Sequence, residues 1–260
     1  MTDLATAQRL ATAPLSVLGA YGHASNTTML VQLTDRMDAP GVRGSDREFV
    51  LDHDGLGRIG SQHLAVWKPV AGQRPLWDFE AASLPHREVA AGVVDHLLGT
   101  DLVPPTVWRL DGPWGPGSLQ AHVPHDPAMH LLSWVESDEY DPGALARLVV
   151  FDLVVNNTDR KASHVLFGEG RFWAIDHGLT FHVDDKVRTV AWQLQGQPVP
   201  DELRVAAGDV ARHLAEKSVP VTEHLHSDEV IATIQRARRV ADSETFPVLD
   251  DRSQLPWPLV

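Results

Sequence analysis

Residues 156–180 read NNTDRKASHVLFGEGRFWAIDHGLT and are the most informative stretch of this 260-residue chain. The stretch holds an Asp-x-Lys-x-x-His element, made by Asp159, Lys161 and His164, and an Asp-His-Gly element that begins at Asp176. Twelve positions lead from the histidine of the first element to the aspartate of the second. Either element alone would occur by chance in many proteins, so the prediction rests on their order and spacing.

These side chains are the groups that phosphoryl transfer requires. Such a site needs a carboxylate beside the acceptor hydroxyl, a cation near the moving phosphoryl group, and ligands that hold a metal ion against the nucleotide phosphates. We expect Asp159 to orient or deprotonate the acceptor hydroxyl and Lys161 to neutralise charge on the transferred group. Asp176 is the expected metal ligand, together with His164 or Asn157.

The two elements resemble the catalytic and metal-binding loops of kinases. Protein kinases carry Asp-x-Lys-x-x-x-Asn or a close variant before Asp-Phe-Gly, and phosphoinositide kinases carry Asp-Arg-His-x-x-Asn before Asp-Phe-Gly. The chain is more similar to the second pattern because Asp159-Arg160 matches its Asp-Arg pair. The chain is therefore identified as a small, divergent bacterial member of the phosphatidylinositol 3-/4-kinase-like group, and it is also similar to the HipA-type kinases.

This resemblance implies an α+β, two-lobed protein-kinase-like fold, with a small β-rich N-lobe and a mainly helical C-lobe. It also implies ATP and Mg²⁺ or Mn²⁺ as cofactors. The expected lobes are residues 1–123, with a nucleotide-covering hairpin and a phosphate lysine, and residues 124–260, with the catalytic and metal-binding loops. No activation segment with an acceptor Ser and a Pro-Glu anchor follows Asp176, which departs from the eukaryotic protein kinases.

The chain departs from the phosphoinositide-kinase pattern at three positions. Lys161 stands where that group has His, His164 stands where it has Asn, and His177 replaces the Phe. Imidazole nitrogen suits Mn²⁺, Zn²⁺ and other transition metals better than Mg²⁺, which prefers oxygen. Alternatively, His164 caps the loop through a hydrogen bond and binds no metal, in which case Asn157 would contribute an oxygen.

Lysine is scarce in this chain, which carries it only at positions 68, 161, 186 and 217. Lys68 ends an alternating apolar run at residues 63–69, a pattern that predicts a strand. A kinase-like enzyme needs a lysine on the α- or β-phosphate. Glu88 lies in the first turns of a helix predicted over residues 85–98, where it could pair with Lys68 or simply favour the helix dipole.

Further nucleotide-binding residues are expected in two places. The segment 15–33 predicts a β-hairpin with a small, polar turn, which is either a nucleotide-covering loop or an ordinary hairpin. A strand over residues 117–123 would lead into an interlobe hinge whose backbone groups meet the adenine edge. The candidates in these two segments are Ser25, Asn26, Thr27, Gln120, His122 and Val123.

The remaining helices and strands are predicted from the spacing of apolar residues and from the proline and glycine residues that interrupt it. The apolar run from 141 to 156 predicts a buried helix that begins at an Asp-Pro pair, and its Asp152 is expected to bond nearby loop backbone rather than act as a catalyst. Further predictions are short strands at 47–51 and 103–109, a hairpin made by strands at 165–167 and 172–175, and helices at 202–214 and 228–241.

Composition narrows the range of partners. The chain carries 35 acidic and 22 basic residues, a formal net charge of −13, which disfavours nucleic acid and anionic lipid surfaces. It has no cysteine, so it forms no disulfide framework and no thiolate zinc site. No signal sequence or bilayer-length apolar run is evident, so we expect a cytoplasmic protein without stable membrane association.

These observations predict an ATP-dependent, metal-dependent phosphotransferase. Its partner would be a hydroxyl-bearing substrate, either a small molecule or a protein. Two alternatives remain: a kinase-fold enzyme that transfers AMP or activates a carboxylate, as in adenylylation or glutamylation, and a nucleotide-binding pseudokinase. The nucleotide product distinguishes the phosphotransferase, which forms ADP, from the first alternative, which forms AMP. Tight nucleotide binding without turnover would identify the pseudokinase.

Overall fold

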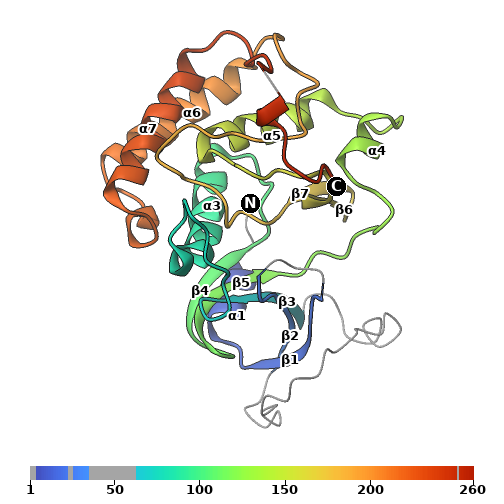
Figure 1. The fold of residues 1–260 in the computed structure, drawn as a ribbon, viewed down its shortest axis with the longest axis vertical. Coiled ribbons are helices and arrows are strands. Elements are labelled where there is room, and N and C mark those ends of the chain that lie inside the picture. The colour runs from blue at the N-terminus through green and yellow to red at the C-terminus, as the bar shows by residue number, and fades with distance from the viewer. Residues whose placement is uncertain (1–3, 23–25, 35–62, 251) are drawn as a thin grey trace. The chain divides into compact units, whose positions relative to one another are not determined.

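The computed structural model describes residues 4–22, 26–34, 63–250 and 252–260, whose fold is shown in Figure 1. The chain forms two compact units. The first contains Thr2–Val89 and Pro104–Pro124, and the second contains Ala90–Val103 and His125–Val260. The sequence placed one boundary between residues 123 and 124, and the structure in addition groups Ala90–Val103 with the second unit.

The first unit is built on an antiparallel sheet with the strand order β1-β2-β3-β5-β4. Its strands are β1 (Leu15–Ala20), β2 (Met29–Leu33), β3 (Leu64–Pro69), β4 (Thr106–Gly112) and β5 (Gly115–Ala121). The hairpin predicted over 15–33 is confirmed, since β1 and β2 pair with Leu15 opposite Leu33. Helix α1 (Leu4–Thr12), which the sequence analysis did not predict, adds Leu10 to the core of this sheet.

Strand β3 holds two functionally different side chains next to each other. Trp67 is fully buried in the core of the sheet, and its indole Nε1 donates to the carbonyl of Pro113 at 2.8 Å. Gly112 makes room for it, because a Cβ at that position would come within 2.1 Å of the Trp67 ring. Successive strand residues point to opposite faces, so the anchored Trp67 places Lys68 on the other face of the sheet.

Strand β4 begins later than the sequence suggested. The prediction started it at Val103, whereas its first residue is Thr106. Pro104 and Pro105 explain the difference, because proline has no N–H to donate to a ladder. Helix α3 (Leu84–Leu98) confirms the helix predicted over 85–98 to within one residue.

The second unit is mainly helical. It contains α4 (Leu131–Val135), α5 (Pro142–Val155), β6 (Val165–Gly168), β7 (Arg171–Ala174), α6 (Asp201–Ala215) and α7 (Ser227–Asp242). Short 3₁₀ turns of this unit cover Ala162–His164, Pro220–Glu223 and Arg252–Gln254, and one in the first unit, Ala81–Ser83, precedes α3. The predicted helices and the β6–β7 hairpin are confirmed, and so is the α+β class with a β-rich first part and a mainly helical second part.

Helix α5 is the buried element that leads into the decisive loop. Asp141 caps its N-terminus by accepting the Gly143 N–H at 2.8 Å, and Pro142 occupies the first turn, where a missing N–H costs nothing. The helix ends at Asn156, which has a left-handed φ of 54°. The Asn156 side-chain amide donates to the carbonyls of His182 and Asp184 at 3.0 and 2.7 Å, which fixes the reversal of the chain.

Two expectations lie outside the described residues: the strand at 47–51 and the position of Ser25. Among the helices of the described part of the chain, none combines the length and apolar character that crossing a bilayer requires.

Candidate active site

Arg160 connects the two elements of the decisive stretch. Its side chain is fully buried, and its Nη1 donates to the carbonyls of His164 at 3.2 Å and Ile175 at 2.8 Å. Its Nη2 lies 2.8 Å from Nε2 of His177. One guanidinium therefore holds the loop that carries Asp159 against both neighbours of Asp176.

Asp152 neutralises this buried guanidinium. Its carboxylate accepts from Arg160 Nε at 3.2 and 3.1 Å and from Nη2 at 3.0 Å, and only 1% of its side chain is exposed. The sequence analysis expected Asp152 to bond loop backbone, whereas it bonds side chains of the loop. An uncompensated buried charge is costly, so this pair matters for the folding of the loop.

Both polar atoms of the Asn157 side chain make hydrogen bonds with neighbouring residues. Its Nδ2 donates to Asp152 at 3.0 Å, and its Oδ1 accepts the N–H of Asp159 at 3.0 Å. The residue is 1% exposed. These contacts favour a supporting role, and metal binding by Asn157 stays a prediction.

His177 has a defined protonation state in this arrangement. Arginine only donates hydrogen bonds, so the Nε2 that faces Arg160 must accept, and His177 is neutral with its hydrogen on Nδ1. Its ring is fully buried and packs edge-on against Phe151, with the centroids 5.2 Å apart. The histidine thus fills an apolar position and also accepts a bond from Arg160, which Phe could not do.

His164 and Asp176 are brought together as predicted for metal ligands. His164 Nδ1 lies 3.0 Å from the carbonyl oxygen of Asp159, and because a carbonyl only accepts, Nδ1 carries the hydrogen. His164 Nε2 lies 3.3 Å from Oδ2 of Asp176. In neutral His164 the Nε2 atom is an acceptor, as is the carboxylate oxygen of Asp176. Two acceptors repel each other at this distance, so a proton or a metal cation between them is needed to stabilise the contact.

Asp176 is held in a strained backbone conformation. Its φ is 61°, a left-handed value that costs a non-glycine residue roughly 1–3 kcal/mol. The bonds from Arg160 to Ile175 and His177 fix the residue from both sides. Half of the Asp176 side chain is exposed, so the carboxylate is accessible to a ligand.

The residues present fit a divalent metal of the Mn²⁺ type. An imidazole nitrogen and a carboxylate oxygen form a mixed donor set that transition metals accept more readily than Mg²⁺. No group of three or more His, Cys, Asp or Glu that could enclose a metal occurs among the described residues. The remaining ligands of an ion at His164 and Asp176 would therefore be phosphate or water oxygens.

His164→Asn is expected to shift metal preference from Mn²⁺ toward Mg²⁺, because the substitution replaces a nitrogen ligand by a hard amide oxygen. The measurement is the thermal shift of the full chain with ATP and each metal. Ser163→Asn, a neighbouring substitution of an exposed residue, is the control. An unchanged preference would mean that His164 only caps the loop.

Asp159 and Lys161 form an ion pair with each other, and their catalytic roles stay predictions. Lys161 Nζ lies 3.0 Å from Asp159 Oδ2, and the side chains are 19% and 25% exposed respectively. Burial raises the pKa of Asp159 above its ordinary value, the bond from Lys161 opposes this, and the nearby charge of Asp176 adds to it. A carboxylate with a raised pKa is a better proton acceptor in general base catalysis.

The first unit carries the predicted phosphate lysine. Lys68 Nζ forms an ion pair with Oε1 of Glu88, which confirms the pairing that the sequence left open. Glu88 is buried and comes from the first turns of α3, whereas 18% of the Lys68 side chain is exposed. The pair fixes the ammonium on one face of the sheet and leaves part of it accessible.

The other nucleotide-binding candidates of this unit are largely tied into its own structure. Asn26 Oδ1 accepts the N–H of Arg74 at 2.8 Å, and Thr27 Oγ1 donates to the carbonyl of Gly72 at 3.3 Å. Their role in covering a nucleotide stays a prediction.

The predicted adenine segment begins inside the sheet. Gln120 lies on β5 between Val66 of β3 and Thr106 of β4, so its backbone is committed to the sheet, which argues against an adenine contact there. The N–H of His122 donates to Leu64 at 3.2 Å. Val123 lies two residues beyond the end of β5 and remains the candidate for such a contact.

The sequence analysis assigned no role to Arg160 and gave His177 none beyond replacing a Phe. The sequence did contain a signal for both residues, because Arg160 directly follows the motif residue Asp159 and His177 directly follows the motif residue Asp176. Their roles depend on burial and mutual distance, which residue types alone do not reveal.

Comparisons with known proteins identify a relative that aligns with nearly the whole chain. No family model matches the chain. Protein Rv2133c of Mycobacterium tuberculosis (strain ATCC 25618 / H37Rv) is 33% identical over an alignment of 286 positions, and the alignment spans 96% of this chain and 93% of that protein.

Solved structures also align with the chain, among them the following two. The golgi casein kinase aligns over 90% of this chain and 73% of its own, with a TM-score of 0.44 and 12% identity. Hydra Fam20 with sugar aligns over 90% and 86%, with a TM-score of 0.45 and 14% identity.

Proposed function

The chain belongs to the same family as Protein Rv2133c of Mycobacterium tuberculosis, and from the chemistry of its loops we propose that it is an ATP-dependent phosphotransferase with a hydroxyl acceptor. The observation that carries the proposal is the set of bonds made by Arg160. They hold the loop of Asp159 and Lys161 beside His164 and Asp176, which combines a base, a cation and a metal-binding pair.

In the proposed reaction, Asp159 accepts the proton of the acceptor hydroxyl as that oxygen bonds to the γ-phosphorus of ATP. The bond between the γ-phosphorus and its bridging oxygen breaks, and ADP leaves. Lys161 neutralises charge on the transferred group, and Lys68, oriented by Glu88, neutralises charge on the remaining phosphates. Positioning and electrostatics supply most of the rate in such reactions.

Asp176 and His164 would hold the metal ion, which supplies charge neutralisation for the nucleotide phosphates when bound. The role of Arg160 is to position these two ligands. The narrower assignment to the phosphatidylinositol 3-/4-kinase-like group stays a prediction, because it rests only on Asp159-Arg160 and on the spacing to Asp176.

Nucleotide-product analysis by phosphorus NMR tests the proposed function. The full chain is incubated with ATP and either Mg²⁺ or Mn²⁺, beside an Asp176→Asn variant. ADP formed only by the wild type supports phosphoryl transfer and justifies a screen of hydroxyl acceptors. AMP would reassign the reaction to adenylyl transfer or carboxylate activation, and unchanged ATP despite measurable binding would indicate a binding module.

Lys68→Met is expected to weaken ATP binding by roughly 10- to 100-fold, because it removes a charge-assisted contact to phosphate and breaks the ion pair with the buried Glu88. Isothermal titration with a non-hydrolysable ATP analogue gives the affinity. Lys217→Met, which removes an exposed lysine after α6, is the matched control. Equal affinities of wild type and Lys68→Met would rule out the phosphate role of Lys68.

A further inference from the structure

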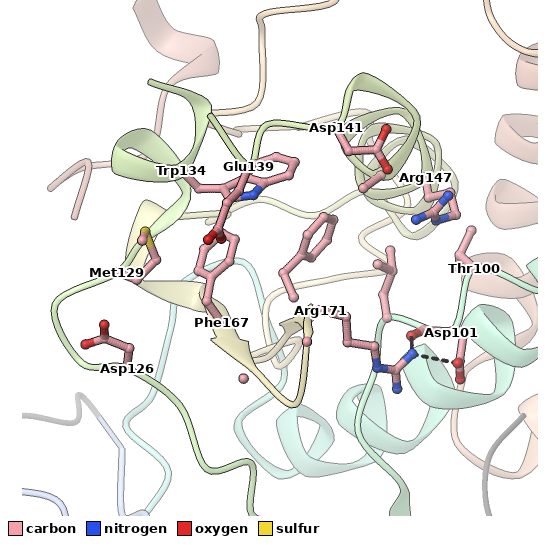
Figure 2. A pocket seen from close by; sticks show the side chains of 15 residues that line it. Thr100, Asp101, Asp126, Met129, Trp134, Glu139, Asp141, Arg147, Phe167 and Arg171 are labelled. Carbon is pink, nitrogen blue, oxygen red and sulfur yellow. Dashed lines mark hydrogen bonds and ion pairs between the residues drawn. The ribbon is translucent and has the colours of Figure 1, made fainter. Parts of the chain in front are cut away.

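The second unit contains a cavity of about 710 Å³ that the proposed phosphotransfer does not use, shown in Figure 2. Its walls come from residues 100–102, residues 126–129, helix α4, the start of α5 and the turn of the β6–β7 hairpin. Cavities of roughly 300–1,000 Å³ typically hold small-molecule ligands. All of these segments belong to one compact unit, so the cavity is a property of that unit alone.

One wall of the cavity is aromatic. Trp134 lies 5.6 Å from Phe167 and 5.4 Å from Phe172, measured between ring centroids. The N–H of Asp126 donates to the carbonyl of Phe167 at 3.0 Å, which fixes the preceding loop against the hairpin. Such rings offer a firm surface for an apolar or aromatic body and also attract cations.

The charges around the cavity are unequal. Asp101 and Arg171 neutralise each other through a 2.6 Å ion pair, which Figure 2 shows as a dashed line. Three further carboxylates line the cavity, against one further guanidinium, that of Arg147; they belong to Asp126, Glu139 and Asp141. Three negative charges against one positive charge leave a surplus of two negative charges.

These groups are available to a ligand. Within the described part of the chain, the side chains of Glu139 and Arg147 make no hydrogen bond or ion pair. Asp126 and Asp141 each accept one backbone N–H, from Ala128 and Gly143, but neither forms an ion pair with another described residue. Arg147 is half-buried and has no anionic partner among the residues that the structure describes.

We propose that this cavity binds a small amphoteric molecule with an aromatic body, in which cationic groups outnumber anionic ones. The cationic groups lie against Glu139, Asp126 and Asp141, the anionic group binds Arg147, and the ring packs on half-buried Phe167 beside Trp134. A dipeptide made of one basic and one aromatic residue has this chemistry and fits this volume.

The cavity is separate from the candidate active site. It lies at the turn of the hairpin, where Gly168 pairs with Arg171, whereas His164 and Asp176 flank the opposite end, where Val165 pairs with Ala174. Three residue steps along a strand span roughly 10 Å. Occupancy of the cavity therefore does not depend on the proposed function, and it can be measured without nucleotide.

The test is isothermal titration of the full chain with three dipeptides. Arginyl-phenylalanine carries every group of the proposed ligand, citrullyl-phenylalanine lacks the guanidinium charge, and arginyl-phenylalaninamide lacks the carboxylate. We expect the first to bind at least about tenfold more tightly than either of the others, as loss of a charge-assisted bond implies.

Two variants assign the contacts. Glu139→Gln should remove most of the preference for arginine over citrulline, and Arg147→Gln should remove most of the preference for the free carboxylate over the amide. Glu136→Gln, at an exposed position that does not line the cavity, should leave both preferences unchanged. Absence of saturable binding, equal binding of the three dipeptides, or preferences that persist in both variants would overturn the proposal.

Discussion

Asp159→Asn is expected to lower the rate of phosphoryl transfer by roughly 10²- to 10⁴-fold, the range that a positioned general base contributes. The affinity for the metal–nucleotide complex should stay close to that of the wild type, because His164 and Asp176 are unchanged. ADP formation at saturating ATP and acceptor, together with titration of a non-hydrolysable analogue, separates turnover from binding. Asp138→Asn, at an exposed position, is the control.

The same substitution should leave the metal-free protein as stable as the wild type or more stable. Burial raises the pKa of Asp159, so the folded state favours its protonated form and this contribution to stability is lost as the pH rises through the folded pKa. At neutral pH the charged carboxylate therefore costs stability, and asparagine removes that cost. A variant that loses activity because it unfolds, or one that turns over like the wild type, would contradict the assigned role.

Arg160→Met is expected to destabilise the protein by about 3–5 kcal/mol, because it leaves the carboxylate of Asp152 buried without a counter-charge. Activity should fall with it, since the carbonyls of His164 and Ile175 lose the donor that positions them. Chemical denaturation followed by tryptophan fluorescence gives the free energy of unfolding. Arg212→Met, which removes an exposed pair with Asp209, should have little effect.

The double variant Arg160→Met/Asp152→Asn separates folding from positioning. Removing both charges should restore most of the lost stability, because no buried charge then remains unpaired. Phosphoryl transfer should nevertheless stay low, because the two loops are still not tied together. Recovery of activity along with stability would show that Arg160 serves folding only.

The sequence by itself determined the elements and the chemical character of the site. The spacing of apolar residues, together with prolines and glycines at the ends of elements, predicted α3, α5, α6, α7 and both hairpins, because these elements bury apolar residues at regular intervals. The sequence analysis did not predict helices α1 and α4 because they are short, with nine and five residues, and their ends depend on contacts with other parts of the chain. The spacing of the motifs identified Asp159, Lys161, His164 and Asp176 as candidates before any geometry was known.

Only the tertiary structure decided how those residues are held. Fully buried Arg160 bonds residues up to 17 positions away. Its structural role depends on contacts with Asp152 and His177, and no local sequence pattern links either residue to Arg160. The left-handed backbone of Asp176 is likewise tolerated only because its two neighbours are fixed from outside. Residue types determine which chemistry is available, whereas burial and distance between remote segments determine charge state, strain and orientation. The cavity beside Trp134 could not be predicted from the sequence, because its walls come from distant segments that only folding brings together.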